Sequence, residues 1–472
     1  MDILNLLGRE EGANNREHAY NVLYNNIMNL LLVPGTVLQE SEIAAKLQVS
    51  RTPVREAIFQ LREERLVEIE PRRSSTITKI SPLLVEEARM VRTALESAIC
   101  HHLCGNLDTS VTQRLHDNLI LQEQAVREND SNSFLIIDKE FHEILYLAAG
   151  KPDVWAARRS LNSHLERINH LESSRNGGFL NELYQSHKDI YYCLLTGLSD
   201  GIDAVFTNHF SISAGPTEEC EAIYPQYFQN DSLANFSGSA KPTKQNSSEL
   251  AYHVIRSRIM TMELAPGQLL NEGQFAGELN ISRTPVREAI LRLKEEKLVE
   301  VYPQRASVVS LIDFSIINQS FFLRKTLEPQ VLRMAAERLP ETPELQAIME
   351  KNLADQQQVL QQNLPHSFFQ LDNEFHQLLY HMAGIPHIWE FINRLSGHYN
   401  RLRYFDVVLG TMKLRGLHRE HTAIWHALLD GHCEDAVGLL EPHLAGFQNT
   451  RPFLLPEYRG YFRGMEAMGR NA

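Results

Sequence analysis

Histidines recur along this sequence at one constant separation, and one aspartate recurs with them. The repeated pairs are Asp138/Asp372, His142/His376, His164/His398, His187/His421 and His209/His443. Asp138 lies four residues before His142, so the two side chains share one face of a helix. Imidazole and carboxylate are ligands that divalent transition metals accept, provided that the fold brings them together.

A short loop, GLSDG at 197–201, separates the last two histidines of the first set. His187 precedes Gly197 by ten residues, and His209 follows Ser199 by ten. Two antiparallel helices joined here would place both imidazoles at the same level, about 15 Å from the turn. Three imidazoles and one carboxylate converging inside a bundle are typical of a metal site, although each histidine could also be an ordinary core or surface residue. The pattern predicts a divalent transition metal (Zn, Ni, Co or Mn) in each copy, held by Asp138, His142, His187 and His209 and by Asp372, His376, His421 and His443.

Two arginines also recur, Arg92 with Arg324 and Arg167 with Arg401, the second pair three residues after His164 and His398. An inward guanidinium near a metal ion would bind a carboxylate, because both attract anions. A surface arginine paired with a local glutamate is the alternative interpretation. The candidate effector-binding residues are Arg92, His164, Arg167, Arg324, His398 and Arg401.

The nonapeptide SRTPVREAI occurs twice, at 50–58 and at 282–290. Thr52 can cap a helix, and Pro53 suits its first turn. The apolar residues that follow at helical spacing form a buried stripe, which leaves Arg51, Thr52 and Arg55 on the outer side of the helix start. Arginine at such an end can reach the O6 and N7 atoms of guanine, and the helix start can hold a phosphate. A capped surface helix with two solvated arginines is the alternative.

The nonapeptide belongs to a much longer repeat. Residues 19–81 align with 251–313 without gaps at 31 identities in 63 positions, and DKEFHEILYLAAGKPDVW (138–155) aligns with DNEFHQLLYHMAGIPHIW (372–389). A period of about 230 residues is too long for a solenoid, whose repeats run roughly 20–50 residues. The chain is therefore a tandem duplication of two full-sized modules.

Each module begins with a segment of mixed character and continues as helices only. Two helices precede the nonapeptide helix, and VEIEPRRSSTITKI or VEVYPQRASVVSLI follows it as strand, turn and strand. Three helices and a hairpin form a winged helix-turn-helix, in which the third helix enters the major groove of DNA. The wing carries Arg72, Arg73 and Arg305.

The order helix, Pro-Gly, short helix, SRTPVREAI and arginine-bearing wing resembles the GntR family of bacterial transcription regulators. The all-helical remainder resembles its FadR-type branch, which carries the FCD effector domain. The resemblance implies DNA contacts at Ser50, Arg51, Thr52, Arg55, Ser282, Arg283, Thr284 and Arg287, and wing contacts near Arg72, Arg73 and Arg305. It also implies an Asp/His/His/His metal set and a small organic or sugar acid as effector. Ser74 and Ala306 depart from the family pattern, in which glycine usually follows the wing arginine.

Composition agrees with a water-soluble protein of the reducing cytoplasm. Of 472 residues, 43% are hydrophobic and 22% charged, no apolar run reaches the roughly 18 residues that span a bilayer, and the N-terminus is not that of a secretory signal. The five cysteines have no counterparts between the copies, which argues against a disulfide framework. Net charge is −13, so DNA contacts would come from placed cations and not from an overall basic field.

We therefore predict a mainly α protein with two winged helix-turn-helix domains (16–81, 249–313), two all-α antiparallel bundles (82–228, 314–465) and a linker (229–248). The predicted function is effector-controlled, sequence-specific regulation of transcription, on a near-palindromic operator in double-stranded DNA. The two heads would form a pseudo-dimer within one chain, and further pairing of chains is left open. A metal-dependent hydrolase using the same Asp/His/His/His site is the alternative, although no repeated free carboxylate is placed as its general base.

Overall fold

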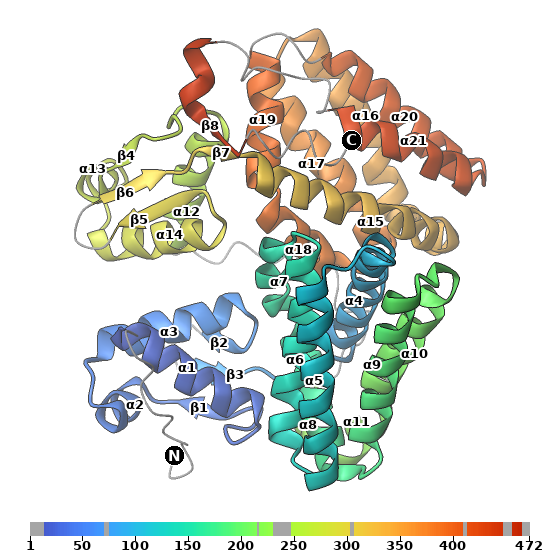
Figure 1. Cartoon of the computed structure of the whole chain (residues 1–472). Helices are drawn as coiled ribbons and strands as arrows, with labels where there is room; N and C mark the ends of the chain where they lie inside the picture. The colour runs from blue at the N-terminus through green and yellow to red at the C-terminus, as the bar shows by residue number, and fades with distance from the viewer. Residues whose placement is uncertain are drawn as a thin grey trace. The chain divides into compact units, whose positions relative to one another are not determined.

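The computed structural model describes residues 14–69, 75–214, 217–229, 247–302, 306–408, 413–446 and 456–464. The chain divides into two compact units, residues 1–236 and 237–472. Each unit consists of a small α/β head followed by a helical bundle (Figure 1). The predicted mainly α fold with two winged helix-turn-helix heads and two helical bundles is confirmed. No described helix is long and apolar enough to cross a membrane, and all five cysteines are free thiols.

The first head contains three helices and a three-stranded sheet. Its elements are α1 (Asn15–Met28), β1 (Val37–Leu38), α2 (Glu40–Leu47), α3 (Arg51–Glu63), β2 (Val67–Ile69) and β3 (Ser75–Ile77). The strands are antiparallel in the order β1-β3-β2, with Val67 opposite Ile77 and Val37 opposite Thr76. A capping box begins α1, because the Asn14 side chain accepts from the backbone of Glu17 while the Glu17 side chain accepts from Asn14.

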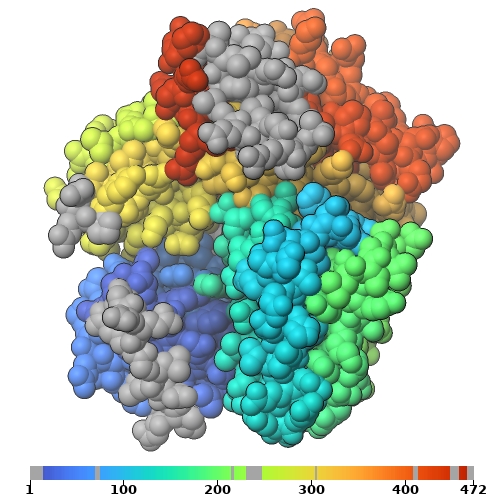
Figure 2. All heavy atoms as spheres, viewed as in Figure 1, coloured from blue at the N-terminus to red at the C-terminus, as the bar shows by residue number. Residues whose placement is uncertain are grey.

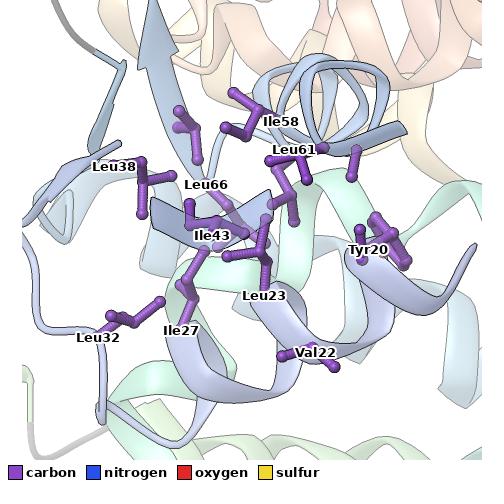
Figure 3. Packing of buried hydrophobic residues seen from close by; sticks show 14 of the residues in the cluster. Tyr20, Val22, Leu23, Ile27, Leu32, Leu38, Ile43, Ile58, Leu61 and Leu66 are labelled. Carbon is purple, nitrogen blue, oxygen red and sulfur yellow. The ribbon is translucent and has the colours of Figure 1, made fainter. Parts of the chain in front are cut away.

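One apolar core fixes the three helices of this head against each other (Figure 3). Leu23 and Ile27 of α1, Ile43 of α2, and Ile58 and Leu61 of α3 are all fully buried or nearly so. The α3 residues are spaced three or four apart, so burial of this stripe turns the opposite face of α3 to solvent. The core thereby determines which residues α3 presents.

The second head repeats this design. Its elements are α12 (Ser247–Met260), β4 (Leu269–Leu270), α13 (Glu272–Glu278), α14 (Arg283–Glu295), β5 (Val299–Tyr302) and β6 (Ala306–Val309). The sheet order β4-β6-β5 matches that of the first head. Gln48 and its counterpart Asn280 both adopt a left-handed backbone, with φ of 54° and 53°, in the turn before the third helix. The helix-turn-helix geometry is therefore the same in both copies.

The first bundle is entirely helical. It contains α4 (Pro82–Leu103), α5 (Thr109–Glu128), α6 (Ser131–Ala148), α7 (Pro152–Ala157), α8 (Arg159–Arg175), α9 (Phe179–Thr196), α10 (Ile202–Ala214) and α11 (Thr217–Ile223). Side chains cap its helices, as where Ser81 accepts from the backbone of Leu84 at the start of α4. In the space-filling view α5 lies on an outer surface of this bundle (Figure 2).

The second bundle follows the same order with a longer first helix. It contains α15 (Phe314–Arg338), α16 (Pro343–Gln361), α17 (Pro365–Met382), α18 (Pro386–Leu395), α19 (Gly397–Val408), α20 (Leu414–Leu429) and α21 (Cys433–Ala445). Pro343, Pro365 and Pro386 each stand in a first turn, where a missing N–H costs nothing.

The end of each bundle returns to the segment that joins its head to its first helix. Phe228 forms a parallel bridge with Ile80 in the first unit. In the second unit β7 (Ile312–Asp313) pairs in parallel with β8 (Phe462–Arg463). The motif Tyr-x-x-Tyr-Phe occurs at 224–228 and again at 458–462. Its final residue thus closes each module on itself, with Phe228 and Phe462 both buried.

Candidate DNA-reading helices and buried histidine clusters

The third helix of each head begins with the predicted DNA-contacting residues. Ser50 and Ser282 are the residues before the first helical turn of α3 and α14. All eight non-wing candidates are exposed: Ser50, Arg51, Thr52, Arg55, Ser282, Arg283, Thr284 and Arg287. Both helix starts therefore offer backbone N–H groups and cations to an anionic surface. The wing candidates Arg72, Arg73 and Arg305 lie outside the described residues.

An ion pair already positions Arg55. Its Nε and Nη2 donate to Oε1 and Oε2 of Glu40 at 3.1 and 2.9 Å, while 64% of the Arg55 side chain remains exposed. Exposed pairs of this kind contribute little to stability, about 0–1 kcal/mol. The pair holds the guanidinium beside α2 at small cost and leaves it available for exchange with a DNA group.

A groove lies beside the third helix of the second head. Its volume is about 730 Å³, and Arg283 and Arg287 of α14 line it together with Glu272 of α13 and Tyr302 of β5. The groove brings the two arginines of the nonapeptide to one solvent-open face.

Three buried histidines converge in the first bundle. Each of His142 on α6, His187 on α9 and His209 on α10 contributes one ring nitrogen to a group within 4.8 Å of one another. The Nε2 atoms of His142 and His187 are 3.3 Å apart. Oδ1 of Asp138 lies 3.4 Å from His187 Nε2 and 4.0 Å from His142 Nε2. Helices far apart in sequence thus assemble the predicted donor set.

The other ring nitrogens of His187 and His209 are hydrogen-bonded to neighbouring side chains, and a buried carboxylate lies beside that of His142. His187 Nδ1 lies 2.8 Å from Gln122 Oε1, and His209 Nδ1 lies 2.8 Å from Ser186 Oγ. His142 Nδ1 lies 2.5 Å from Oε2 of a buried glutamate on α4, Glu96. Such partners fix ring orientation and tautomer, as they do around metal-bound histidines.

The second bundle contains the corresponding cluster of His376, His421 and His443. His443 Nε2 is 3.3 Å from His376 Nε2. His421 Nδ1 lies 3.0 Å from Gln356 Oε1, whereas its buried Nε2 has no hydrogen-bond partner. A buried ring nitrogen that makes no hydrogen bond destabilises the folded state, unless a ligand such as a metal ion binds it. The donor set therefore fits a divalent metal ion.

Burial favours the neutral form of the His187, His209 and His421 imidazoles, which is the form that binds metal. Desolvation lowers the pKa of His187, His209 and His421 well below the usual value. For Asp138, desolvation raises the pKa to about 7, although Arg92 opposes the rise.

The recurrent Arg92 and Arg324 each pair with a glutamate four residues on. Arg92 Nε donates to Glu96 at 2.9 Å, and Arg324 Nε donates to Glu328 at 2.5 Å. Both glutamates also lie beside a clustered histidine, since Glu328 Oε2 is 3.2 Å from Nδ1 of His376. The arginines are therefore joined to the clusters through a shared carboxylate.

His164 and Arg167 on α8 contact the segment between the first head and its bundle. His164 Nδ1 accepts from the backbone N–H of Ser81 at 2.9 Å. Arg167 Nη1 donates to the carbonyl of Thr78 at 2.7 Å. The structure thus places these predicted effector residues at the head–bundle junction.

Their counterparts in the second unit make equivalent contacts. His398 Nδ1 accepts from the backbone N–H of Asp313 at 3.0 Å, and Arg401 Nη1 donates to the Ser310 carbonyl at 3.0 Å. Burial without an acidic partner lowers the pKa of Arg401 to about 9, as it does for Arg167. All four side chains thus bind the backbone of the segment between head and bundle.

A cavity of about 200 Å³ opens at the same junction in the first unit. It is lined by Tyr24 of α1 and by residues of α4, α6 and α8 and the α7–α8 junction that include Arg92, Asp138, Lys139, Arg158, Glu166 and Asn169. Arg158 is 4% exposed, and its Nε has no hydrogen-bond partner. The cavity therefore joins a DNA-binding head, a candidate metal ligand and an incompletely satisfied guanidinium.

Both parts of each module match known family models. The chain matches the model "Bacterial regulatory proteins, gntR family" at residues 15–77 and 247–309, and the model "FCD domain" at 87–211 and 319–446. The chain belongs to the GntR family of bacterial transcription regulators. It carries the DNA-binding and FCD domains of this family twice, so the resemblance inferred from the sequence is confirmed.

Relatives of this GntR-family chain match about half of it. The HTH-type transcriptional repressor RspR of Escherichia coli is 34% identical over 189 residues, which are 40% of this chain and 80% of RspR. A regulator in an unstable DNA locus of Streptomyces ambofaciens is 30% identical over 225 residues, 48% of this chain and 94% of the relative. Among solved structures, Escherichia coli McbR/YncC matches with a TM-score of 0.39 at 22% identity, over 43% of this chain and 94% of that one.

Sequence reasoning missed several residues that the structure brings to these sites. Gln122 and Gln356 recur at the same separation as the histidine pairs and could have been found from that signal. Arg158, Lys139 and Glu166 could not, because the second copy has other residues at these positions and no repetition marks them.

Proposed function

We propose that this GntR-family regulator reads a near-palindromic operator with its two heads and that a small organic or sugar acid controls the reading. The observation that carries the proposal is the repeated nonapeptide. Both copies present Arg51/Arg283 and Arg55/Arg287 at an exposed helix start. Two DNA-binding helices with the same exposed residues on one chain are expected to bind two half-sites of related sequence.

The metal is proposed to be held by Asp138, His142, His187 and His209 in the first bundle. Asp372, His376, His421 and His443 form the second candidate set. A bound ion would supply a Lewis-acid anchor for a carboxylate. The protein side chains orient the donors and exclude water.

The class of effector follows from the cavity beside Asp138. A carboxylate there would accept from Arg158 Nε, which lacks a partner in the structure. Paired guanidinium and carboxylate groups bind well in buried sites. A relative named "Gluconate operon transcriptional repressor" of Bacillus licheniformis, 30% identical over 120 residues (25% of this chain and 49% of the relative), supports a sugar acid.

Control of DNA binding would pass through the head–bundle junction. Tyr24 of the first head accepts a hydrogen bond from Lys139 at 3.2 Å and donates to Glu166 at 3.2 Å, and all three line the cavity. An effector that rearranges these contacts would change the position of the head relative to the bundle. Such coupling requires different effector affinities in the two head arrangements.

The proposal is tested by selecting DNA from a random duplex library with the full chain. We expect two inverted copies of one short sequence, and two unrelated half-sites would contradict the proposal. Binding to the selected duplex is then measured with D-gluconate, citrate and acetate in the presence of Zn²⁺ or Ni²⁺. A change with a carboxylate that Arg158→Ala abolishes would support the effector site, and no change with any of them would argue against it. Sedimentation of the complex counts the chains on each duplex.

A further inference from the structure

The two histidine clusters differ in the surroundings of their aspartate. In the first, the ion-pair contacts of Asp138 within the described chain are with His142 and His187. In the second, Asp372 Oδ1 likewise lies 3.5 Å from His421 Nε2, but Asp372 also forms a two-pronged ion pair with Arg403 of α19. Arg403 Nη1 and Nη2 donate to Oδ2 and Oδ1 of Asp372, both at 2.8 Å.

This ion pair is deeply buried. The side chains of Arg403 and Asp372 are 4% and 1% exposed, whereas that of Asp138 is 12% exposed and lines the cavity of the first bundle. Both oxygens of Asp372 thus accept charge-assisted bonds that are shielded from water. Arginine and carboxylate in this geometry make one of the strongest side-chain pairs.

The sequence difference that creates the pair is a single position. Arg403 stands in the second copy where the first copy has Asn169, an uncharged residue that lines the first cavity. Its neighbour Phe369 replaces Leu135 of that cavity, and the Arg403 guanidinium lies 5.4 Å from the Phe369 ring centre. An arginine and a larger aromatic ring therefore replace an amide and an aliphatic side chain at the corresponding places in the second bundle.

A second difference acts in the opposite direction but is weaker. His443 Nδ1 lies 2.8 Å from Glu420, where the first cluster has Ser186 beside His209. A carboxylate partner makes an imidazole a better ligand. The side chain of Glu420 is 47% exposed, so water screens its charge far more than that of buried Arg403.

We infer that the two clusters are unequal ion sites and that Arg403 is the cause. In the first, Asp138 is free to complete the donor set of three imidazoles beside an open cavity. In the second, Arg403 takes the carboxylate of Asp372. An ion there is held by three imidazoles alone and more weakly. This inference rests on the proposed metal binding and adds that the first module carries the main ion site.

Cobalt binding to the full chain separates the two sites. The double substitution His421→Ala/His443→Ala leaves only the first cluster, and His187→Ala/His209→Ala leaves only the second. The dissociation constant for Co²⁺ is measured from its visible absorption bands during titration. We expect the second cluster to bind roughly 10–100-fold more weakly, the range found when groups around metal ligands are changed.

Two further variants test the role of the guanidinium. Arg403→Asn, in the chain with only the second cluster, is expected to strengthen Co²⁺ binding at least about ten-fold. Asn169→Arg, in the chain with only the first cluster, is expected to weaken Co²⁺ binding by a similar factor. This second test does not depend on the folding of the Arg403→Asn variant. Arg333→Asn on α15 is the matched control, because it removes one exposed positive charge that pairs with Glu434.

The outcomes distinguish this inference from the proposed function. Equal affinities of the two clusters, with no effect of Arg403→Asn or Asn169→Arg, would overturn the inference and leave metal-dependent regulation standing. Absence of Co²⁺ binding at both clusters would overturn the inference together with the metal part of the proposed function. Circular dichroism of each variant confirms that the helices remain.

Discussion

Replacement of Glu166 by Gln should destabilise the first unit in a pH-dependent manner. Glu166 on α8 lies 3.3 Å from Lys139 Nζ and 3.5 Å from Arg158 Nη1, and it accepts a hydrogen bond from Tyr24 of the head. Burial alone would raise the pKa of Glu166, but Lys139 and Arg158 together outweigh burial and lower the pKa to about 2. The folded state therefore favours the ionised carboxylate.

The size of the effect follows from that shift. A decrease from an ordinary value of 4.5 to about 2 corresponds to about 3 kcal/mol, at 1.36 kcal/mol per pKa unit. Because the folded pKa is depressed, this contribution is fully present above pH 4.5 and is lost as the pH falls towards 2. The difference between wild type and variant in free energy of unfolding should be about 3 kcal/mol at pH 7 and about 1 kcal/mol smaller at pH 4.

Urea unfolding followed by tryptophan fluorescence measures this difference. Trp389 and Trp425 are replaced by Phe, so that Trp155 alone reports the first unit. Glu86→Gln is the control, since this exposed carboxylate on α4 pairs with Arg89 at the surface and its loss should change stability by less than about 1 kcal/mol. A Glu166→Gln variant that unfolds like wild type at pH 7, or whose deficit grows as the pH falls, would refute the ion-network explanation.

Three other perturbations have defined outcomes. Arg167→Met removes the bond to the Thr78 carbonyl at the head–bundle junction and should cost about 1–3 kcal/mol in thermal or urea unfolding; a stability equal to wild type would show that the bond is dispensable. Phe228→Ala should cost about 3–5 kcal/mol by opening the closure of the first module, and a loss below about 1 kcal/mol would contradict that role. A chelator should lower the melting temperature of ion-loaded protein, since ligand at 100 times its dissociation constant adds about 2.7 kcal/mol; the effect should vanish in His187→Ala/His421→Ala, and persistence there would place the ion elsewhere.

Much of the fold was predictable because the sequence patterns that indicate it occur in two copies. The helix that the nonapeptide begins has a buried stripe of Val54, Ala57, Ile58 and Leu61, and the spacing alone predicts which face of α3 is buried. The ten-residue counts on either side of the 197–201 loop anticipated that His187 and His209 would meet, and their ring centres are 4.7 Å apart.

The search for repeated residues failed to find the cavity of the first unit. The contacts of Arg158 with Glu166 and of Arg403 with Asp372 each exist in one copy alone, because Ile392 and Asn169 stand at the matching positions. A comparison of the copies disregards positions that differ. Those are the positions at which duplicated modules acquire different properties. The junction contacts of Arg167 could not be foreseen either, because hydrogen bonds to backbone carbonyls leave no mark in residue type.

The central claim is that two matched helix starts on one chain read DNA, and the Arg55→Ala/Arg287→Ala double variant tests it most directly. Affinity for the selected two-half-site duplex and for an unrelated duplex is measured at fixed salt concentration, beside Arg55→Ala and Arg287→Ala singly. Each single substitution should cost about 1–3 kcal/mol on the selected duplex, and the double variant should bind both duplexes equally. Unchanged affinity and unchanged preference for the selected duplex in the double variant would contradict the account.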